Sequence, residues 1–242
     1  MGSRLAFACV VVLGTAPYAP AGEQPLRVCM LSGAWEYESH KSLPILKEFL
    51  EKNYGARCTI VQAERKQGDN VPGMEALDDA DVMVLFMRRQ KLKGEQLERF
   101  KAWCEKGKPI VGIRTASHAV QTWLDFDKLV LGGNYRGHYG KGTCTVTLTD
   151  EGKKHPILKG VEPFESRGSL YKNTGLKATN ILMFGEAGGH HEPVAWTHTY
   201  KGGRIFYTSL GHQGDFKNEH FLRLLANAIF WVAEREPGKA PK

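Results

Sequence analysis

Beyond its first 21 residues, the 242-residue sequence has no long hydrophobic run. This excludes a membrane-spanning helix from the rest of the chain, because such a helix needs about 20 consecutive apolar residues. A short apolar run at residues 5–14 follows the basic Arg4 and precedes the small-residue stretch at 19–21. This order is typical of a secretory signal peptide. We therefore expect residues 1–21 to be removed and the mature protein to be exported, to the periplasm or the medium.

Cysteine is scarce, and no CxxC motif occurs, which argues against a cysteine-based zinc site. Cys9 belongs to the predicted signal peptide. An even number of cysteines then remains, and outside the cytosol these residues are free to form disulfides. Their surroundings favour small buried hydrophobes instead. Cys29 and Cys58 lie in apolar strand-like segments and Cys104 lies in a helical one, so the sequence leaves open the disulfide state of these three and of Cys144.

Blocks of basic residues interleaved with aromatic side chains are also missing. The chain has 33 Lys and Arg residues against 26 Asp and Glu, which gives a formal net charge of +7. Arg4 is the only charged residue of the signal peptide, so the mature charge is +6. Scattered basic residues indicate a solvated surface, and we expect no nucleic-acid partner. The hydrophobic content of 42% is ordinary for a soluble domain with a substantial core.

The first half of the chain alternates between strand and helix patterns. A continuous apolar run at 81–87 predicts a strand buried on both faces. The helix expected at 41–53 has Pro44 in its first turn, and the helix expected at 94–107 stops at Gly107. Short connections between such elements indicate a parallel, doubly wound sheet. The predicted strands of this half lie at residues 26–31, 57–63, 81–87 and 108–114.

The second half is less regular. The glycine-rich segment 129–142 predicts a long loop, and Lys201-Gly202-Gly203 predicts a hairpin turn between antiparallel strands. An amphipathic helix at 220–234 closes the pattern. We predict a single-domain α/β fold over 22–236, with a mostly parallel sheet, helices on both faces and late antiparallel strands, and a flexible tail at 237–242. The late strands are expected at residues 143–149, 180–186, 193–200 and 204–210, and residues 155–161 and 164–175 are expected to connect elements.

Polar side chains follow the predicted strands. Because the carboxyl ends of parallel strands meet at one edge, where ligands bind, we expect the loops after the strands to form a site. Alone, each residue has a plain structural explanation, such as a surface charge for Arg88 or a turn hydrogen bond for His118. Their convergence from five loops favours function. The loops supply Trp35, Glu36, Tyr37, Arg88, Arg89, Arg114, Thr115, Ser117, His118, Asn134, Tyr135, His138, Tyr139, His190, His191, Glu192, His212 and Asp215.

These residue types suit a polar, hydroxyl-rich ligand. Arginine presents a fixed fork of donors, aromatic faces pack on sugar rings, and histidine with a carboxylate performs acid–base work near neutral pH. We expect proton transfer from His118, His138, His212, Glu192 and Asp215. We expect substrate binding by Trp35, Glu36, Tyr37, Arg88, Arg114, Thr115, Asn134 and Tyr135.

Metal and serine chemistry are supported less well. His190, His191 and His198 lie close in sequence without the spacing of a known zinc motif, and on a strand the first two would point to opposite faces. The sequence requires no cofactor and leaves a divalent metal open. The segment Gly112 to Ser117, GIRTAS, lacks the G-x-S-x-G pattern of a serine nucleophile.

Several long segments together resemble the trehalose-utilisation (ThuA-like) family. They occur in family order and extend from about residue 26 to 233. The resemblance implies an exported bacterial branch of the family, a class I glutamine-amidotransferase-like superfamily and a flavodoxin-like sheet. The segments are GKPIVGIRTASHAVQTW, VLGGNYRGHYGKG, SRGSLYKNTGL, EPVAWTHTYKGGRIFYTSLGHQGDF and RLLANAIFW.

The resemblance also bears on the site. In true amidotransferases the turn after the fourth strand carries a catalytic cysteine, whereas Arg114 and Thr115 occupy that turn here. His212 matches the family histidine, and Asp215 matches the acid only loosely in spacing. Without a thiolate there is no route to a glutamyl thioester, so we expect no glutamine amidotransferase activity.

The family association with disaccharide and keto-sugar metabolism implies a small-molecule sugar or keto-sugar ligand. A base beside a 3-keto sugar, with an arginine near the developing enolate, would isomerise it or eliminate a substituent. Two alternatives stay open: a non-catalytic carbohydrate-binding protein, and a metal-dependent hydrolase built on the histidines. The sequence does not fix the oligomeric state, so a homo-oligomer also stays open.

Overall fold

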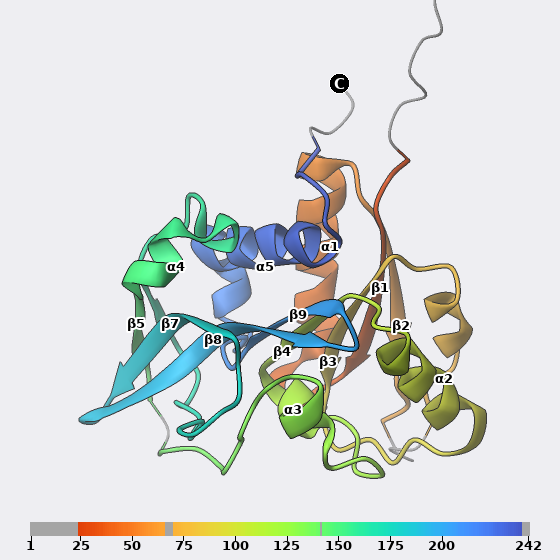
Figure 1. The fold of residues 1–242 in the computed structure, drawn as a ribbon, viewed down its shortest axis with the longest axis horizontal. Coiled ribbons are helices and arrows are strands. Elements are labelled where there is room, and N and C mark those ends of the chain that lie inside the picture. Colours follow the sequence, from red (N-terminus) through yellow and green to blue (C-terminus); the bar gives the residue numbers. More distant parts are fainter. Residues whose placement is uncertain (1–23, 66–69, 141, 239–242) are drawn as a thin grey trace, which may run out of the picture.

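The computed structural model describes residues 24–65, 70–140 and 142–238. These residues form a nine-stranded sheet with helices packed on it (Figure 1). The predicted signal peptide lies outside the described residues, as do the last four residues of the predicted tail. Within the described parts of the chain, no helix combines the length and apolar character that a membrane span requires.

One half of the sheet is parallel. Its strand order, β2-β1-β3-β4-β9, is that of a flavodoxin-like doubly wound sheet. All six residues of β3 are buried, as the continuous apolar run predicts. The strands are β1 (Arg27–Gly33), β2 (Arg57–Gln62), β3 (Val82–Met87), β4 (Ile110–Ile113) and β9 (Gly203–Thr208).

The other half is antiparallel and continues from β9 in the order β8-β7-β5-β6. The sheet is therefore mixed, and the mostly parallel sheet expected from the sequence is found only in part. Two tight hairpins explain the antiparallel pairs β7–β8 and β8–β9, because the turns at 188–189 and 201–202 have positive φ at both residues. The strands are β5 (Cys144–Leu148), β6 (Phe164–Ser166), β7 (Asn180–Ala187) and β8 (His190–Tyr200).

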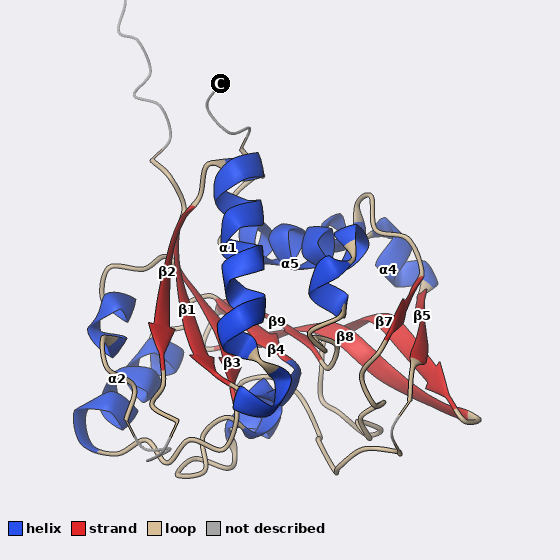
Figure 2. Cartoon of the chain, turned by 180° about the vertical axis from the view of Figure 1, so that it is seen from behind, coloured by secondary structure: helices blue, strands red, loops and turns tan. Residues whose placement is uncertain are grey.

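Helices cover both faces of the parallel half. In Figures 1 and 2, α1 and α5 lie on one face, and α2 and α3 lie on the other. The alternation of side chains along β3 separates two cores: Val84 and Phe86 join one, and Met83 and Leu85 join the other. The helices are α1 (Ser39–Tyr54), α2 (Gly94–Glu105), α3 (Phe126–Leu129), α4 (Asp150–Lys154), which packs on β7, and α5 (Glu219–Val232).

Two local expectations are wrong. Pro44 lies inside α1 rather than in its first turn, because the helix already begins at Ser39, just after Glu38 accepts the amide protons of Lys41 and Ser42. Strand β6 falls within a segment expected to be a connection, and three residues are too few to show a clear alternation. The four described cysteines are free and buried, which agrees with their interpretation as small hydrophobes.

Candidate functional site

The carboxyl ends of the parallel strands meet at one edge of the sheet, the lower edge in Figure 2. Short 3-10 helices follow three of these strands: η1 (Trp35–Tyr37) after β1, η3 (Arg114–His118) after β4 and η5 (Asp215–Lys217) after β9. Seven side chains gather here, and we call them the edge cluster. Its members are Tyr37, Arg88, Arg89, Arg114, His118, Tyr135 and Tyr171.

Arg114 is the centre of the edge cluster. Its side chain is only 1% exposed, and its guanidinium carbon lies 4.4 Å from the ring centre of Tyr37 and 4.7 Å from that of Tyr171. Nη1 donates to the Ser209 carbonyl at 2.8 Å, and Nη2 donates to Ser169 Oγ at 3.2 Å. Burial lowers the pKa of Arg114, but Tyr171 and Tyr37 outweigh it, so the guanidinium stays charged. The hydrogen bonds and ring contacts of Arg114 are therefore made within the protein, and little of the side chain faces solvent.

The backbone of Arg114 has a φ of 47°, in the left-handed region that non-glycine residues rarely adopt. The Tyr207 hydroxyl donates to the Arg114 carbonyl at 2.6 Å and holds the turn. Thr115, the next residue, is fully buried, and its Oγ1 has no hydrogen-bond partner among the described residues. A sharp, strained turn thus follows β4, and an enclosed arginine stands at its start.

His118 is the half-buried imidazole of the edge cluster. Its ring stacks on Tyr135 at 4.5 Å between centres, and its Nδ1 lies 3.0 Å from Ser117 Oγ. Its Nε2 has no hydrogen-bond partner among the described residues. Burial, together with repulsion from nearby Arg88 and Arg89, lowers the pKa of His118 to about 4. The imidazole is therefore neutral at physiological pH.

The segment after β3 is fastened to the same turn. The Arg89 amide donates to the His118 carbonyl at 2.9 Å, and the Gln90 amide donates to the Ala119 carbonyl at 2.6 Å. The Arg88 guanidinium forms an ion pair with Glu36 at 3.0 Å, at the rim of the site. Arg88 and Glu36, both expected to bind substrate, are thus brought together beside His118.

The late loop places His212 and Asp215 next to the edge cluster without joining their side chains. Asp215 is buried, and its Oδ2 accepts from Ser166 Oγ at 2.7 Å and from the amides of Gly211 and His212 at 2.9 and 3.0 Å. The Nδ1 of His212 accepts the Gly214 amide instead of contacting the carboxylate. The carboxylate of Asp215 therefore holds its own loop closed.

The other late candidates lie on the antiparallel side. Glu192 stands within β8 rather than in a loop, because β8 starts at His190. Its carboxylate accepts from the Tyr139 hydroxyl, the Asn173 amide and Thr174 Oγ1, each at 2.8 Å. Glu192 thus ties the glycine-rich loop and the 167–176 segment to the sheet.

Two candidates of the glycine-rich loop are engaged locally. Asn134 donates to the Thr174 carbonyl at 2.7 Å, which connects the same two loops. His138 is exposed, with Nδ1 2.7 Å from the Tyr139 carbonyl, and its backbone bridges to Tyr171 of the edge cluster.

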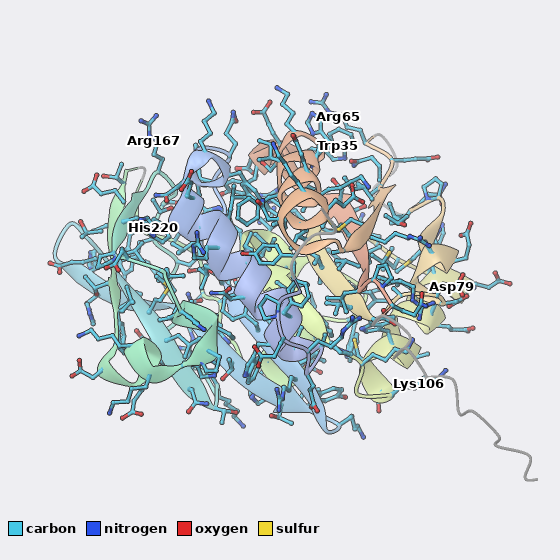
Figure 3. All side chains as sticks on the ribbon, turned by 90° about the horizontal axis from the view of Figure 1, so that it is seen from above. Trp35, Arg65, Asp79, Lys106, Arg167 and His220 are labelled. Atoms are coloured by element: carbon cyan, nitrogen blue, oxygen red, sulfur yellow. The ribbon has the colours of Figure 1, made fainter. Side chains whose placement is uncertain are left out.

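Trp35 lies at the outer side of the site. Its ring centre is 4.8 Å from that of His40, and the guanidinium of Arg65 lies 5.5 Å above it. Figure 3 shows Trp35 and Arg65 beside one another. The Trp35 indole nitrogen is buried and has no hydrogen-bond partner among the described residues. This aromatic surface adjoins the edge cluster through Glu36 and Tyr37.

Sequence reasoning missed Tyr171 and Asp127. Tyr171 contacts Arg114 because an isolated backbone bridge to His138 holds it there, and no periodic sequence pattern predicts this pairing.

Asp127 in α3 accepts the Tyr135 amide at 2.8 Å, and burial raises the pKa of Asp127 to about 6. Gly133 is the only sequence signal for this contact, since a Cβ there would come 2.2 Å from Asp127 Oδ1. Asp127, Ser117, His118 and Tyr135 line a cavity of about 180 Å³ with Val120, Trp123, Leu124 and Phe126.

Gly168→Ala tests how firmly Arg114 is held. An added Cβ would lie 2.6 Å from Arg114 Nη1, and the guanidinium has little room to move because the rings of Tyr37 and Tyr171 both pack against it. We expect the free energy of unfolding to fall by about 1–3 kcal/mol, the usual cost of overpacking. Gly140→Ala, where an added Cβ meets nothing within 4 Å, is the control for urea denaturation. Equal stability of both variants would show that Arg114 is loosely packed.

Asp127→Asn is expected to raise the free energy of unfolding relative to wild type, by an amount that grows as the pH rises. The folded pKa of about 6 lies above the ordinary 3.8, so the stabilising contribution of Asp127 is lost as the pH increases across this interval. Asparagine keeps an acceptor for the Tyr135 amide without the buried charge. Relative to wild type, the variant should gain up to about 3 kcal/mol between pH 4 and pH 7, at about 1.4 kcal/mol per pKa unit. Urea denaturation at both pH values measures this. The exposed neighbour variant Asp125→Asn should show no such gain, and a gain as large there would contradict the assignment.

No group of three metal-ligating side chains comes together within the described ranges. His190 stacks on Tyr139 at 3.7 Å and His191 stacks on Phe184 at 4.2 Å. His198 lies on β8 against Gly132. These three histidines, considered as possible metal ligands from the sequence, are thus engaged separately.

The fold and the edge cluster define a doubly wound α/β domain with a candidate ligand site at the carboxyl edge of its sheet. Residues 27–232 match the family model described as ThuA, trehalose utilisation. The chain belongs to this family. The family indicates a role in trehalose utilisation and, more broadly, in carbohydrate metabolism.

Solved structures support the fold. A ThuA-like protein from Parabacteroides merdae is 21% identical, with a TM-score of 0.71 over 90% of this chain and 94% of that one. A ThuA-like protein from Bacteroides uniformis is 18% identical, with a TM-score of 0.66 over 93% and 99%. The β-galactosidase of Rahnella sp. R3 is 13% identical, with a TM-score of 0.59, and the match covers 87% of this chain but 32% of the enzyme. No curated protein matches the sequence significantly.

Proposed function

We propose that the edge cluster binds a sugar or keto-sugar and moves protons on it, with His118 as the base. The observation that carries this proposal is the neutral imidazole of His118, half-buried among three arginines and stacked on Tyr135. The arrangement suits a reaction that creates negative charge on the ligand.

The proposed step starts from a keto-sugar, whose C–H bond beside the carbonyl is acidic. His118 Nε2, free of hydrogen-bond partners among the described residues, takes this proton. The electron pair of the C–H bond forms a C=C bond to the carbonyl carbon, and the π pair of the carbonyl moves to its oxygen, which gives an enolate. Return of the proton to the same carbon on the opposite face gives an isomer with inverted configuration there. Elimination results instead when the enolate re-forms the carbonyl, a C=C bond forms to the next carbon, and the substituent on that carbon leaves with its bonding electrons.

The positive charges stabilise the enolate. Arg88 and Arg89 lie beside His118, where their positive charge favours a negative oxygen over a neutral carbonyl. The same negative charge would raise the pKa of His118 during the reaction, since an anion stabilises the imidazolium. The base is thus uncharged in the free protein and becomes stronger as the enolate forms.

Aromatic rings near the imidazole suit a sugar ring. Tyr135, which stacks on His118, and Tyr37, which lies against Arg114, are both only partly buried, and apolar sugar faces pack on aromatic rings of this kind. Neighbours that share the fold include ThuA-like proteins and one part of a β-galactosidase, which is consistent with a carbohydrate ligand. The proposal includes export of the mature protein, based on the signal-like residues 1–21.

Glutamine hydrolysis does not belong to this proposal. The turn after β4 presents Arg114, whose guanidinium is enclosed. The four described cysteines are buried, and the charge of Arg114 acts on one of them, Cys144. Burial raises the pKa of Cys144 to about 11, so its thiol stays protonated. A thioester intermediate therefore has no nucleophile at this turn.

Solvent exchange tests the proposed reaction. The purified mature protein is mixed with a 3-keto glucoside in deuterium oxide, and proton NMR follows the hydrogen beside the carbonyl. We expect protein-dependent deuterium incorporation, followed by isomer or elimination product. Saturable binding without exchange would leave a carbohydrate-binding protein and overturn the catalytic proposal. Exchange that disappears with a chelator and returns with a divalent metal would favour the metal-dependent alternative.

A further inference from the structure

Positive charge at the edge cluster exceeds the negative charge that faces it. Of its three arginines, Arg88 is paired with Glu36 at 3.0 Å. Arg114 is enclosed by two tyrosine rings and lies near the buried Asp215, whose carboxylate also accepts four hydrogen bonds. Arg89 remains, exposed and without a hydrogen bond or ion pair from its side chain to any described residue.

The backbone of Arg89 is nevertheless fixed in place. Its φ of 51° puts a non-glycine residue in the left-handed region, which costs about 1 kcal/mol or more. The amide of Arg89 and that of Gln90 donate to the carbonyls of His118 and Ala119, and a further bridge joins Gln90 to Val120. A glycine would adopt this conformation without strain. The backbone thus holds an arginine, at some cost, beside the imidazole.

The surroundings of His118 show the same excess. The groups that act most on its charge are Arg88, Arg89 and Arg114, all positive. The carboxylate of Asp127 lines the same cavity, and burial raises the pKa of this group to about 6. The exposed rim continues the pattern with Arg65 above Trp35 and with Arg136, whose Nε donates to Asn134. Clefts lined by one sign of charge concentrate ligands of the opposite sign.

We propose that the sugar bound here carries a permanent negative group, a carboxylate or a sulfate, and that Arg89 binds this group beside His118. This inference rests on the proposed function, since it assumes that the edge cluster is the sugar site. Arginine suits either group, because its planar fork donates two parallel hydrogen bonds to a pair of anionic oxygens. Bound there, the anion would neutralise the one arginine of the cluster that lacks a partner among the described residues.

The test compares matched sugars. Binding of glucose, glucuronate and glucose 6-sulfate is measured by calorimetry at low salt. We expect at least one charged sugar to bind tenfold or more tightly than glucose, and the better of the two identifies the anion. Arg89→Gln should remove this preference. Arg57→Gln should keep it, because Arg57 is exposed at the opposite end of the parallel strands.

Two results would overturn the inference: glucose binding as tightly as both charged sugars, or an Arg89→Gln variant that keeps the full preference. The proposed function fails separately. If a neutral keto-sugar undergoes His118-dependent exchange but charge brings no gain in affinity, only the anionic group is wrong. If no sugar binds and no exchange occurs, both proposals are wrong.

Discussion

Replacing Arg114 with methionine is expected to lower the free energy of unfolding by about 3–5 kcal/mol, the range for removing one partner of a buried charged network. Methionine keeps part of the volume between Tyr37 and Tyr171 but loses both cation–π contacts. It also leaves the Ser209 carbonyl without its donor. Urea denaturation followed by tryptophan fluorescence measures the change.

Two further variants make this prediction specific. Arg89→Met removes an exposed arginine with the same backbone conformation and should change stability by no more than about 0.5 kcal/mol. Arg114→Lys keeps the charge but not the fork that reaches Ser209 and Ser169 together, so it should recover little of the loss. A stable Arg114→Met protein would show that the turn after β4 does not depend on the guanidinium.

Replacing His118 with glutamine is expected to slow exchange and turnover of a keto-sugar by about 10²–10⁴-fold, the usual contribution of a general base. Glutamine preserves a polar, planar side chain near Tyr135 and Ser117, so we expect the protein to stay folded. His191→Gln, a change at an exposed histidine stacked on Phe184, is the matched control and should leave turnover unchanged. Equal rates in both variants and wild type would remove His118 from the mechanism.

The pH dependence follows from the same residue. A base with a pKa of about 4 stays uncharged from pH 8 to about pH 5. Protonation of His118 should therefore lower the rate only as the pH approaches 4. The ordinary histidine pKa of 6.5 means that the unfolded chain binds a proton between pH 6.5 and 4 that the folded protein does not bind. Stability therefore falls as the pH falls through this interval. In His118→Gln this part of the loss should be absent.

The parallel half of the fold follows from simple sequence patterns. Continuous apolar runs such as 82–87, alternating with amphipathic helices, allow few other packings than a doubly wound sheet. The antiparallel half is harder to predict, because β6 is short and the residues that begin β8 are His190 and His191. Their pairing depends on the two-residue turn at 188–189 rather than on any apolar pattern.

The site residues that follow parallel strands are likewise easier to predict than the others. Tyr37, Arg88 and His118 follow parallel strands directly, so strand direction alone brings them to one edge. Glu192 and Asp215 are expected at this edge because their segments adjoin the late strands, but both carboxylates accept several hydrogen bonds from the loops around them. Tyr171 reaches the site by a long-range backbone bridge, which a single sequence does not reveal.

The most direct test of the central claim is a nitrogen–proton NMR spectrum of the histidine rings, recorded between pH 8 and pH 5, with and without a 3-keto glucoside. The account predicts that the His118 ring, assigned with the His118→Gln variant, stays neutral over this range and that its signals shift when the sugar is added. A His118 ring that becomes charged near pH 6, or that is unmoved while the sugar binds, would contradict the account.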